Sequence, residues 1–295
     1  MMKSYLRIQP GGFNIRIARI GGPGLANLLW LWSKMVVAHE LTGLPMVWPE
    51  WRQIKPRSLL RGEFSMGYYP RFFSKSESYI SQPLCYSRGR FVMADEEIMA
   101  GCLQELIQPK VVYGFSYLRD PFEGLYESKQ VVRDAFLEIC PPCYLRTKKT
   151  SEFTIVAHVR RGDFRQLGLG AQIQDYIYAI KRLVEVFKSR VPRVLVCTDA
   201  LPSDQAFWSI MPKEVEVARG SNALEDLCLM MSADVLIGTA RSSYSRAAAY
   251  LGDMPVLWCG ELDVVSKLDG IAPVSASIHE ESIYGDLNEL LSYFQ

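Results

Sequence analysis

Histidine is scarce in this sequence, and the acidic pairs that commonly hold metal ions are missing. The 295 residues include three histidines, at positions 39, 158 and 279, and no Asp-x-Asp triplet. Cys140 and Cys143 form a Cys-x-x-Cys pair, but no second such pair and no His pair completes a zinc site. The two prolines between these cysteines favour a turn between domains over a redox motif. The sequence therefore predicts a protein that uses no metal ion or other cofactor.

The sequence also lacks an excess of charge of either sign and a long uninterrupted hydrophobic run. Its 33 basic and 32 acidic residues give a net charge of +1, whereas nucleic-acid-binding proteins usually carry a basic excess or stripe. The most apolar run, residues 25–39, is interrupted by Ser33 and Lys34 and is too short to span a membrane. The amino-terminal segment has no signal-peptide core, and seven scattered cysteines do not suit a disulfide framework. We therefore expect a cytoplasmic protein with no nucleic-acid partner and no transmembrane segment.

Apolar and amphipathic segments alternate regularly in the second half of the chain. Short apolar segments predict strands, longer amphipathic ones predict helices, and this alternation is typical of a parallel sheet covered on both faces. The predicted strands are 153–159, 193–199, 215–218, 234–239 and 255–258, and the predicted helices include 175–190 and 223–233. The first half is less regular, with a strand at 13–20, a buried helix ending near Gly43 and a strand at 45–48.

A polar stretch at 147–152, preceded by two prolines, predicts a domain boundary. We place an amino-terminal domain at 1–148 and a Rossmann-like domain at 149–295, whose last helix could pack back on the first domain.

Three cationic or polar side chains, His158, Arg160 and Arg161, stand at the end of the apolar strand at 153–159. Because side chains alternate along a strand, His158 and Arg160 leave it on one face, and Arg161 leaves it on the other. Ligands of open parallel sheets bind at the carboxyl ends of the strands, and a guanidinium group can bond two phosphate oxygens at once. The pattern therefore indicates an anion site that includes Arg160. For Arg161, a local ion pair with Asp163 is an equally good interpretation.

Two further signals lie near the predicted strand 234–239. A helix begins within Ser242–Ser245, and its first backbone N–H groups, together with the hydroxyls of Ser242 and Ser243, suit an anion. Simple capping by Ser242 is compatible with that role. Asp226, on the preceding helix, suits a base or ribose, although a solvated helix face is an equal alternative. The glycines at 21–24 lack a following Gly-Lys-Ser/Thr, so they predict no more than a tight turn.

Four segments resemble a known family in the same order. The segment 158–164, HVRRGDF, resembles the H-x-R-R-x-D-Y motif of the α-1,2-fucosyltransferases, which α-1,6- and protein O-fucosyltransferases share loosely. Residues 21–48 resemble that family's G-G-x-G-N-Q segment, and residues 112–139 its G-Y-x-Q and I-R-x-x-F segment. Residues 225–252 resemble its D-x-x-L-M-S and N-S-S-F-S-W-W segment, with Arg246 closer to the α-1,6 enzymes.

The resemblance implies a GT-B architecture, with two Rossmann-like domains facing a cleft, an acceptor side in the first domain and a donor site in the second. It implies inverting, metal-independent transfer of fucose from GDP-fucose to a glycan acceptor. The implied catalytic residues are His158, Arg160 and Asp163. The implied donor-binding residues are Gly22, Gly24, Arg160, Arg161, Asp199, Asp226, Arg241, Ser242 and Ser243.

The sequence departs from the family pattern at several of these positions. Leu25-Ala26-Asn27 replaces Gly-Asn-Gln, Cys197-Thr198-Asp199 replaces Ser-Asp-Asp, and Ala240-Arg241 stands where Asn or Phe is usual. Gly168 occupies the place of the glutamate of the α-1,6 enzymes, so Asp163 is the candidate base, and a base-free dissociative reaction is the alternative. Fucose transfer therefore has two alternatives. One is transfer from another nucleotide sugar such as GDP-mannose, and the other is a nucleotide-sugar-binding protein without turnover.

Overall fold

The computed structural model divides the chain into two compact units, Met1–Pro142 and Cys143–Gln295. The boundary expected at 148 lies outside the described residues, while Cys140 and Pro142 stand at the end of the first unit. The structure describes residues 4–14, 19–49, 51, 53–54, 69, 73–80, 90–99, 101–118, 122, 124–145, 152–161, 171–200, 203–213, 215–218, 222–261, 271–279, 282–284 and 292–294.

The first unit contains a five-stranded parallel sheet. Its strand order is β6 (Tyr79–Ile80), β4 (Met46–Val47), β1 (Tyr5–Ile8), β8 (Val111–Phe115) and β7 (Arg90–Met93). The helices among its described residues are α1 (Leu25–Thr42), α3 (Asp95–Met99) and α4 (Lys129–Ile139), with short 3-10 turns at Leu103–Leu106 and Tyr126–Ser128. Helix α1 is buried from Leu25 to Ala38 except at Asn27, and Gly43 ends it with a positive φ of 65°, as the sequence predicts.

The prediction of a single strand at residues 13–20 is wrong. Phe13–Asn14 (β2) and Arg19–Ile20 (β3) pair with each other in antiparallel fashion, and β3 also pairs with β5 (Gln53–Ile54). Alternating apolar residues mark both strands of such a pair, but they do not show that the chain reverses between them. The sheet of this unit begins instead with β1, which is only four residues long.

A buried ion pair joins two elements of the first unit. Lys34 of α1 has no exposed surface, and its Nζ lies 2.7 Å from the carboxylate of Asp95, at the start of α3. The same carboxylate accepts the backbone N–H groups of Ser116 and Tyr117, just after β8. Lys34 also donates to the Tyr117 carbonyl at 2.9 Å. The pair thus ties α1 and α3 to the carboxyl end of β8.

The second unit contains a seven-stranded sheet that is parallel except at one edge. Its order is β11 (Glu216–Ala218), β10 (Arg193–Thr198), β9 (Thr154–Val159), β12 (Val235–Thr239), β13 (Val256–Cys259), β14 (Ser275–His279) and β15 (Ser282–Tyr284), of which only β15 is antiparallel to its neighbour. The helices that the structure describes in this unit are α6 (Ile173–Val186), α7 (Gln205–Ile210), α8 (Ala223–Met231) and α9 (Ser243–Gly252), and Lys188–Arg190 form a 3-10 turn. The alternation predicted for this half is confirmed.

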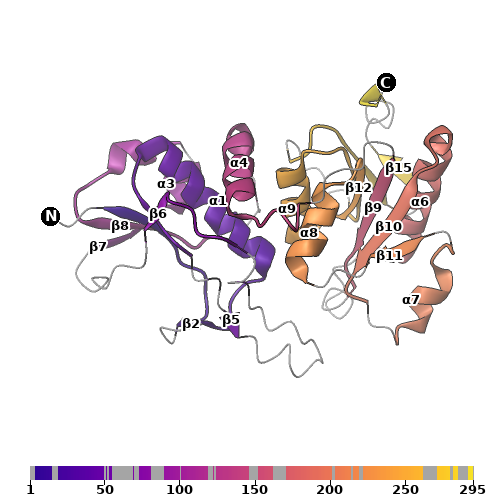
Figure 1. Ribbon diagram of the computed structural model, residues 1–295, viewed down its shortest axis with the longest axis horizontal. Helices are drawn as coiled ribbons and strands as arrows, with labels where there is room; N and C mark the ends of the chain where they lie inside the picture. Colours follow the sequence, from indigo (N-terminus) through magenta and orange to yellow (C-terminus); the bar gives the residue numbers. More distant parts are fainter. Residues whose placement is uncertain are drawn as a thin grey trace. The chain divides into compact units, whose positions relative to one another are not determined.

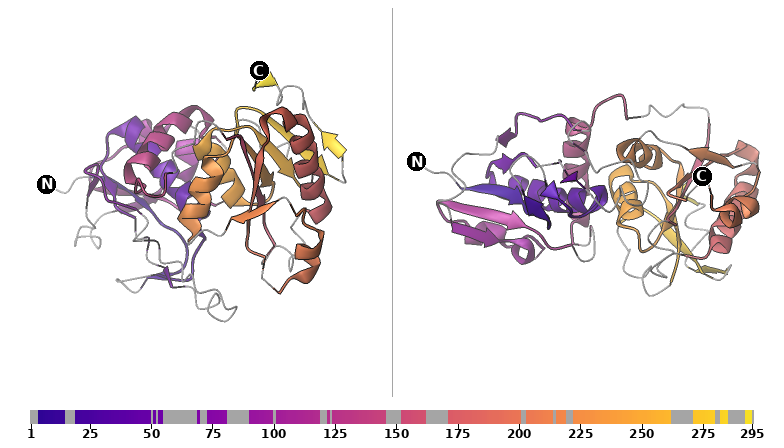
Figure 2. Two further views of the ribbon diagram at one scale, coloured as in Figure 1. Left: turned by 45° about the vertical axis from the view of Figure 1, so that its right-hand side comes forward. Right: turned by 90° about the horizontal axis from the view of Figure 1, so that it is seen from below.

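Helices cover both faces of this second sheet. Figure 1 shows α6 on one face and α8 with α9 on the other, and the two further views in Figure 2 agree. Strand β9 lies between β10 and β12, and its residues Ile155, Ala157 and Val159 belong to the core that includes Tyr176 and Leu183 of α6. Because side chains alternate along a strand, the intervening His158 faces the α9 side.

Among the described residues, no helix is both long enough and apolar enough to cross a membrane.

Candidate functional site

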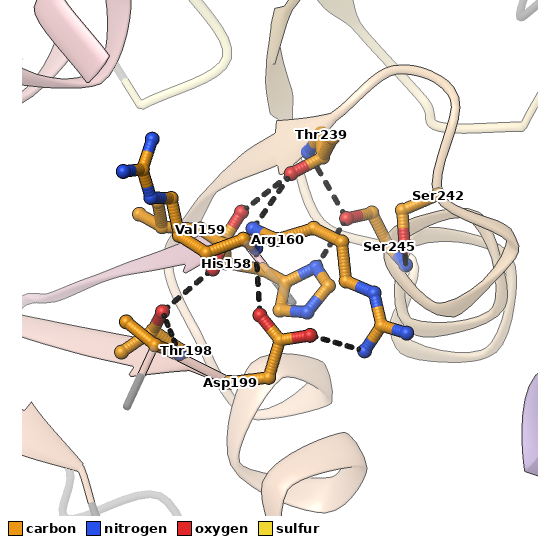
Figure 3. A network of polar contacts seen from close by, with 10 residues as sticks. His158, Val159, Arg160, Thr198, Asp199, Thr239, Ser242 and Ser245 are labelled. Carbon is orange, nitrogen blue, oxygen red and sulfur yellow. Dashed lines mark hydrogen bonds and ion pairs between the residues drawn. The ribbon is translucent and has the colours of Figure 1, made fainter. Parts of the chain in front are cut away.

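Three neighbouring strands of the second sheet bring polar groups to one edge. β10, β9 and β12 are parallel, so their carboxyl ends meet, and Thr198 stands beside Val159 in the register. His158, Arg160, Asp199 and Thr239 therefore come together, as Figure 3 shows. Helix α9 begins four residues after Thr239 and adds Ser242 and Ser245 to the same cluster.

The Asp199 carboxylate contacts the side chain of Arg160 and the backbone of Arg161. Its Oδ2 lies 2.7 Å from Nη1 of Arg160, and its Oδ1 accepts the backbone N–H of Arg161 at 2.6 Å. The two paired side chains are 33% and 30% exposed, so solvent and ligands reach them. In Figure 3 the guanidinium of Arg160 lies on the side of His158, Ser242 and Ser245. The carboxylate thus orients a cation toward the start of α9.

Arg161 leaves β9 on the opposite side and is tied to α7. Its Nη2 lies 3.2 Å from Asp204, which caps α7 by accepting the N–H of Phe207, and its guanidinium lies over the Phe207 ring. The ion-pair partner of Arg161 in the described structure is therefore Asp204. Asp163, the partner considered from the sequence and also the candidate base, lies outside the described residues.

The hydroxyl of Thr239 connects the strands at the centre of the site. It donates to the carbonyl of His158 at 2.8 Å and accepts the N–H of Arg160 at 3.3 Å. Tyr176 of α6 has its hydroxyl 2.7 Å away, and since the Thr239 hydrogen is engaged, Tyr176 is the donor. These bonds fix the backbone from which His158 and Arg160 project.

The His158 side chain is buried against the first turn of α9. Its Nδ1 lies 2.7 Å from Oγ of Ser245, which also accepts the N–H of Thr239 at 3.0 Å. Burial, reinforced by the nearby Arg160 charge and opposed by Asp199, lowers the pKa of His158 to about 4. The imidazole is therefore neutral at physiological pH.

The start of α9 presents its amides at the edge of the sheet. Ser242 is the N-cap, and its hydroxyl accepts the N–H of Ser245 at 3.5 Å. Ser243 is the first helical residue, and first-turn amides have no acceptor within their own helix. The Tyr244 hydroxyl bonds the carbonyl of Ala223, which ties this helix start to that of α8. The positive end of the helix dipole thus faces the region of Arg160.

The other predicted residues occupy three places. Arg241 is exposed and forms an ion pair with Glu261, which follows β13. Asp226 is half-buried in the first turn of α8. Gly22, with φ of 99°, and Gly24, the N-cap of α1, belong to the first unit, and their donor contact stays a prediction.

Sequence reasoning missed Tyr176, Thr239, Tyr244 and Ser245. Their bonds join residues that are far apart in the chain, such as Tyr176 and Thr239, and they depend on strand order. The sequence gives only a weak signal for two of them. Thr239, at the end of a strand, and Ser245, in the first turn of a helix, stand on either side of the predicted Ser242 and Ser243. Among the described residues, no group of three or more His, Cys, Asp or Glu is arranged to hold a metal ion.

Comparison with known proteins identifies the fold. No protein-family model and no curated protein sequence matches this chain. NodZ, an α-1,6-fucosyltransferase of Bradyrhizobium soaked with GDP-fucose, matches with a TM-score of 0.51 and 15% identity, over 85% of this chain and 93% of that one. POFUT1 in complex with GDP has a TM-score of 0.43 and 12% identity, over 88% and 98%. A mutant of Arabidopsis thaliana FUT1 in complex with GDP has a TM-score of 0.47 and 12% identity, over 89% of this chain and 71% of that one.

With its two parallel sheets, the chain has the fold of NodZ, an α/β fold of the GT-B type.

Proposed function

We propose that this protein is an inverting glycosyltransferase that moves fucose from GDP-fucose to a hydroxyl group of a glycan. The observation that carries the proposal is the guanidinium of Arg160 oriented toward the first turn of α9, at the carboxyl edge of a parallel sheet. Open α/β sheets bind their ligands at this edge. The shared fold with NodZ, whose structure was obtained after soaking with GDP-fucose, supports a GDP-sugar as that ligand.

The diphosphate of the donor is the group that Arg160 and α9 suit. When the glycosidic bond of the donor breaks, negative charge develops on the departing GDP. A guanidinium and the amides at a helix start stabilise such charge because they are fixed in place before the reaction. Ser242 and Ser243 supply the helix start, and Asp199 supplies the orientation of Arg160. Because Asp204 binds the Arg161 guanidinium, we assign Arg161 an anchoring role rather than a contact with the donor.

We assign the remaining roles from the resemblance and the position of each residue. Asp226, at the start of α8, is the proposed partner of the guanine edge, and the link between Tyr244 and Ala223 holds that helix start beside α9. Arg241 is a second cation after β12. Asp163 is the proposed base for the acceptor hydroxyl, with a dissociative, base-free reaction as the alternative. We propose that no metal takes part, since the protein's own cationic groups face the diphosphate.

Two alternatives share the same donor site. Transfer from GDP-mannose would use the same contacts to the diphosphate, because those contacts do not touch the sugar. A binding protein without turnover would keep Arg160 and the helix start but release no GDP. GDP affinity therefore does not distinguish these alternatives from the proposed function. The products do, because one alternative forms a mannosylated glycan and the other forms no product.

A turnover assay tests the proposed function. The protein is incubated in EDTA with GDP-fucose or GDP-mannose and a panel of galactose-, glucosamine- and rhamnose-terminated acceptors, and both free GDP and the glycan product are measured. We expect acceptor-dependent GDP release with GDP-fucose and a fucosylated product. A strict need for Mg²⁺ or Mn²⁺ would refute metal independence, and a preference for GDP-mannose would refute the donor. GDP binding without release for any acceptor would favour the inactive binder.

We also propose a cytoplasmic location. The described cysteines are all free thiols, namely Cys102, Cys140, Cys143, Cys197, Cys228 and Cys259. Free thiols are typical of proteins in a reducing compartment.

A further inference from the structure

We propose that Ser245 is a positioning residue that fixes the neutral His158 ring with its proton on Nε2, so that His158 acts as a hydrogen-bond donor to the sugar nucleotide and not as a base. The role in donor binding rests on the proposed function, whereas the tautomer is a property of the protein alone.

Ser245 stands between the ring and the backbone of β12. It has no exposed surface, and its Oγ contacts two groups in the described structure: Nδ1 of His158 at 2.7 Å and the N–H of Thr239 at 3.0 Å. The Thr239 N–H is necessarily a donor, so it takes one lone pair of the serine oxygen. The serine hydrogen then needs an acceptor, and a buried hydroxyl left without one is costly.

Within the described residues, Nδ1 of His158 is the acceptor available to that hydrogen. If Nδ1 receives the Ser245 hydrogen, it carries no proton, and the proton of the neutral ring is on Nε2. The opposite tautomer would leave the Ser245 hydrogen without a partner in this part of the structure. The hydroxyl of Ser245 therefore selects the Nε2–H form.

The charges around the ring favour the same tautomer and the neutral state. Figure 3 shows the Asp199 carboxylate on the side of the ring away from Ser245, with the Arg160 guanidinium paired to that carboxylate. The Asp199 carboxylate stabilises an N–H that points toward it. Arg160 and burial disfavour the imidazolium, which is why the pKa of His158 is lowered to about 4. Tyr244 lies against the ring, with centroids 5.3 Å apart, and limits its rotation.

The chemical consequence concerns the second ring nitrogen. Within the described residues, Nε2 has no hydrogen-bond partner, and the residue as a whole is 4% exposed. An N–H near the Arg160 guanidinium suits an oxygen of an anionic group such as a phosphate. A neutral donor here adds a hydrogen bond without adding charge. It also keeps that bond at any pH above the His158 pKa.

The tautomer can be read directly from nitrogen NMR of protein labelled with [¹⁵N]histidine. The sequence has three histidines, and His158→Gln identifies the signal of His158 by its disappearance. In the ligand-free parent at neutral pH, we expect Nδ1 to be unprotonated and Nε2 to be protonated. A protonated Nδ1, or an imidazolium, would overturn the proposal whether or not the protein is a fucosyltransferase.

The positioning role is tested with Ser245→Ala, Ser245→Cys and the control Ser209→Ala. Ser209 is a serine of α7 whose hydroxyl bonds a carbonyl of its own helix, at an exposed position. We expect Ser245→Ala to mix the two tautomers and to raise the Kd for GDP about tenfold, the loss typical of one hydrogen bond to a charged group. Ser245→Cys, which keeps a weak donor, should restore part of both effects.

Unchanged tautomer and unchanged GDP affinity in a folded Ser245→Ala variant would contradict the proposal. If that variant fails to fold, the spectrum of the parent and the Ser245→Cys variant decide the question. If the tautomer shifts as expected but GDP binds neither parent nor variant, the positioning of the ring stands and the proposed function fails.

Discussion

Replacing Arg160 by lysine is expected to lower kcat/KM for GDP-fucose nearly as much as replacing it by alanine, by about 100- to 1000-fold. Lysine keeps the charge but loses the planar group that bonds two phosphate oxygens at once. It also loses the geometry with which Asp199 orients the guanidinium, whose Nη1 lies 2.7 Å from that carboxylate. Steady-state kinetics at several donor concentrations measures the effect and separates KM from kcat.

Arg193→Lys is the matched control for this substitution. Arg193 pairs with Glu216 and Glu152 at the amino end of β10, at the opposite edge of the same sheet. Its replacement should leave the kinetics unchanged. If Arg160→Lys kept more than about half of the activity, Arg160 would act only as a distant charge, and the argument from the planar group would fail.

Replacing Asp95 by alanine should lower the free energy of unfolding by about 3–5 kcal/mol, because it leaves the buried Lys34 ammonium without its counter-ion. Two backbone N–H groups, of Ser116 and Tyr117, also lose their acceptor. Lys34→Met should cost less, since the Asp95 carboxylate keeps both of these donors. Adding Lys34→Met to the Asp95→Ala variant should recover part of its loss. Urea denaturation of the three variants measures the differences.

The pH dependence of Asp95→Ala gives a second test of the same pair. Burial lowers the pKa of Lys34, and Asp95 opposes that shift through its hydrogen bond and charge. Without Asp95 the pKa should fall further below 10.5, so the unfolded chain binds more protons than the folded one in that window. The variant should therefore gain stability relative to the parent as the pH rises toward 10.5. A constant difference between the two proteins across this range would show that Lys34 does not carry the effect.

The second unit could be predicted closely from the sequence. Its strands are apolar on both faces and its helices are amphipathic, so each segment matches one structure, as β9 and α6 illustrate. The first unit was harder. Tyr5–Ile8 is short and contains Arg7, so its pattern does not stand out as a central strand. The antiparallel pair β2 and β3 shows the same limit, because a reversal of the chain leaves the alternation intact.

The charged part of the site could be predicted, and its hydroxyl network could not. His158 and Arg160 follow an apolar strand, and Ser242 precedes a helix, which are local signals. The links from Tyr176 to Thr239 and from Ser245 to His158 require the order of β9 and β12 in the sheet. Such contacts depend on tertiary structure, and a hydroxyl group on a helix has no local mark that identifies its partner.

Calorimetric titration of GDP into the protein in EDTA tests whether the edge formed by Arg160 and the start of α9 binds a nucleotide diphosphate without metal. We expect measurable GDP binding to the parent, weaker binding of UDP, and loss of GDP binding in Arg160→Ala with the fold intact. GDP binding that requires added Mg²⁺ or Mn²⁺, or that is unchanged in Arg160→Ala, would contradict this expectation.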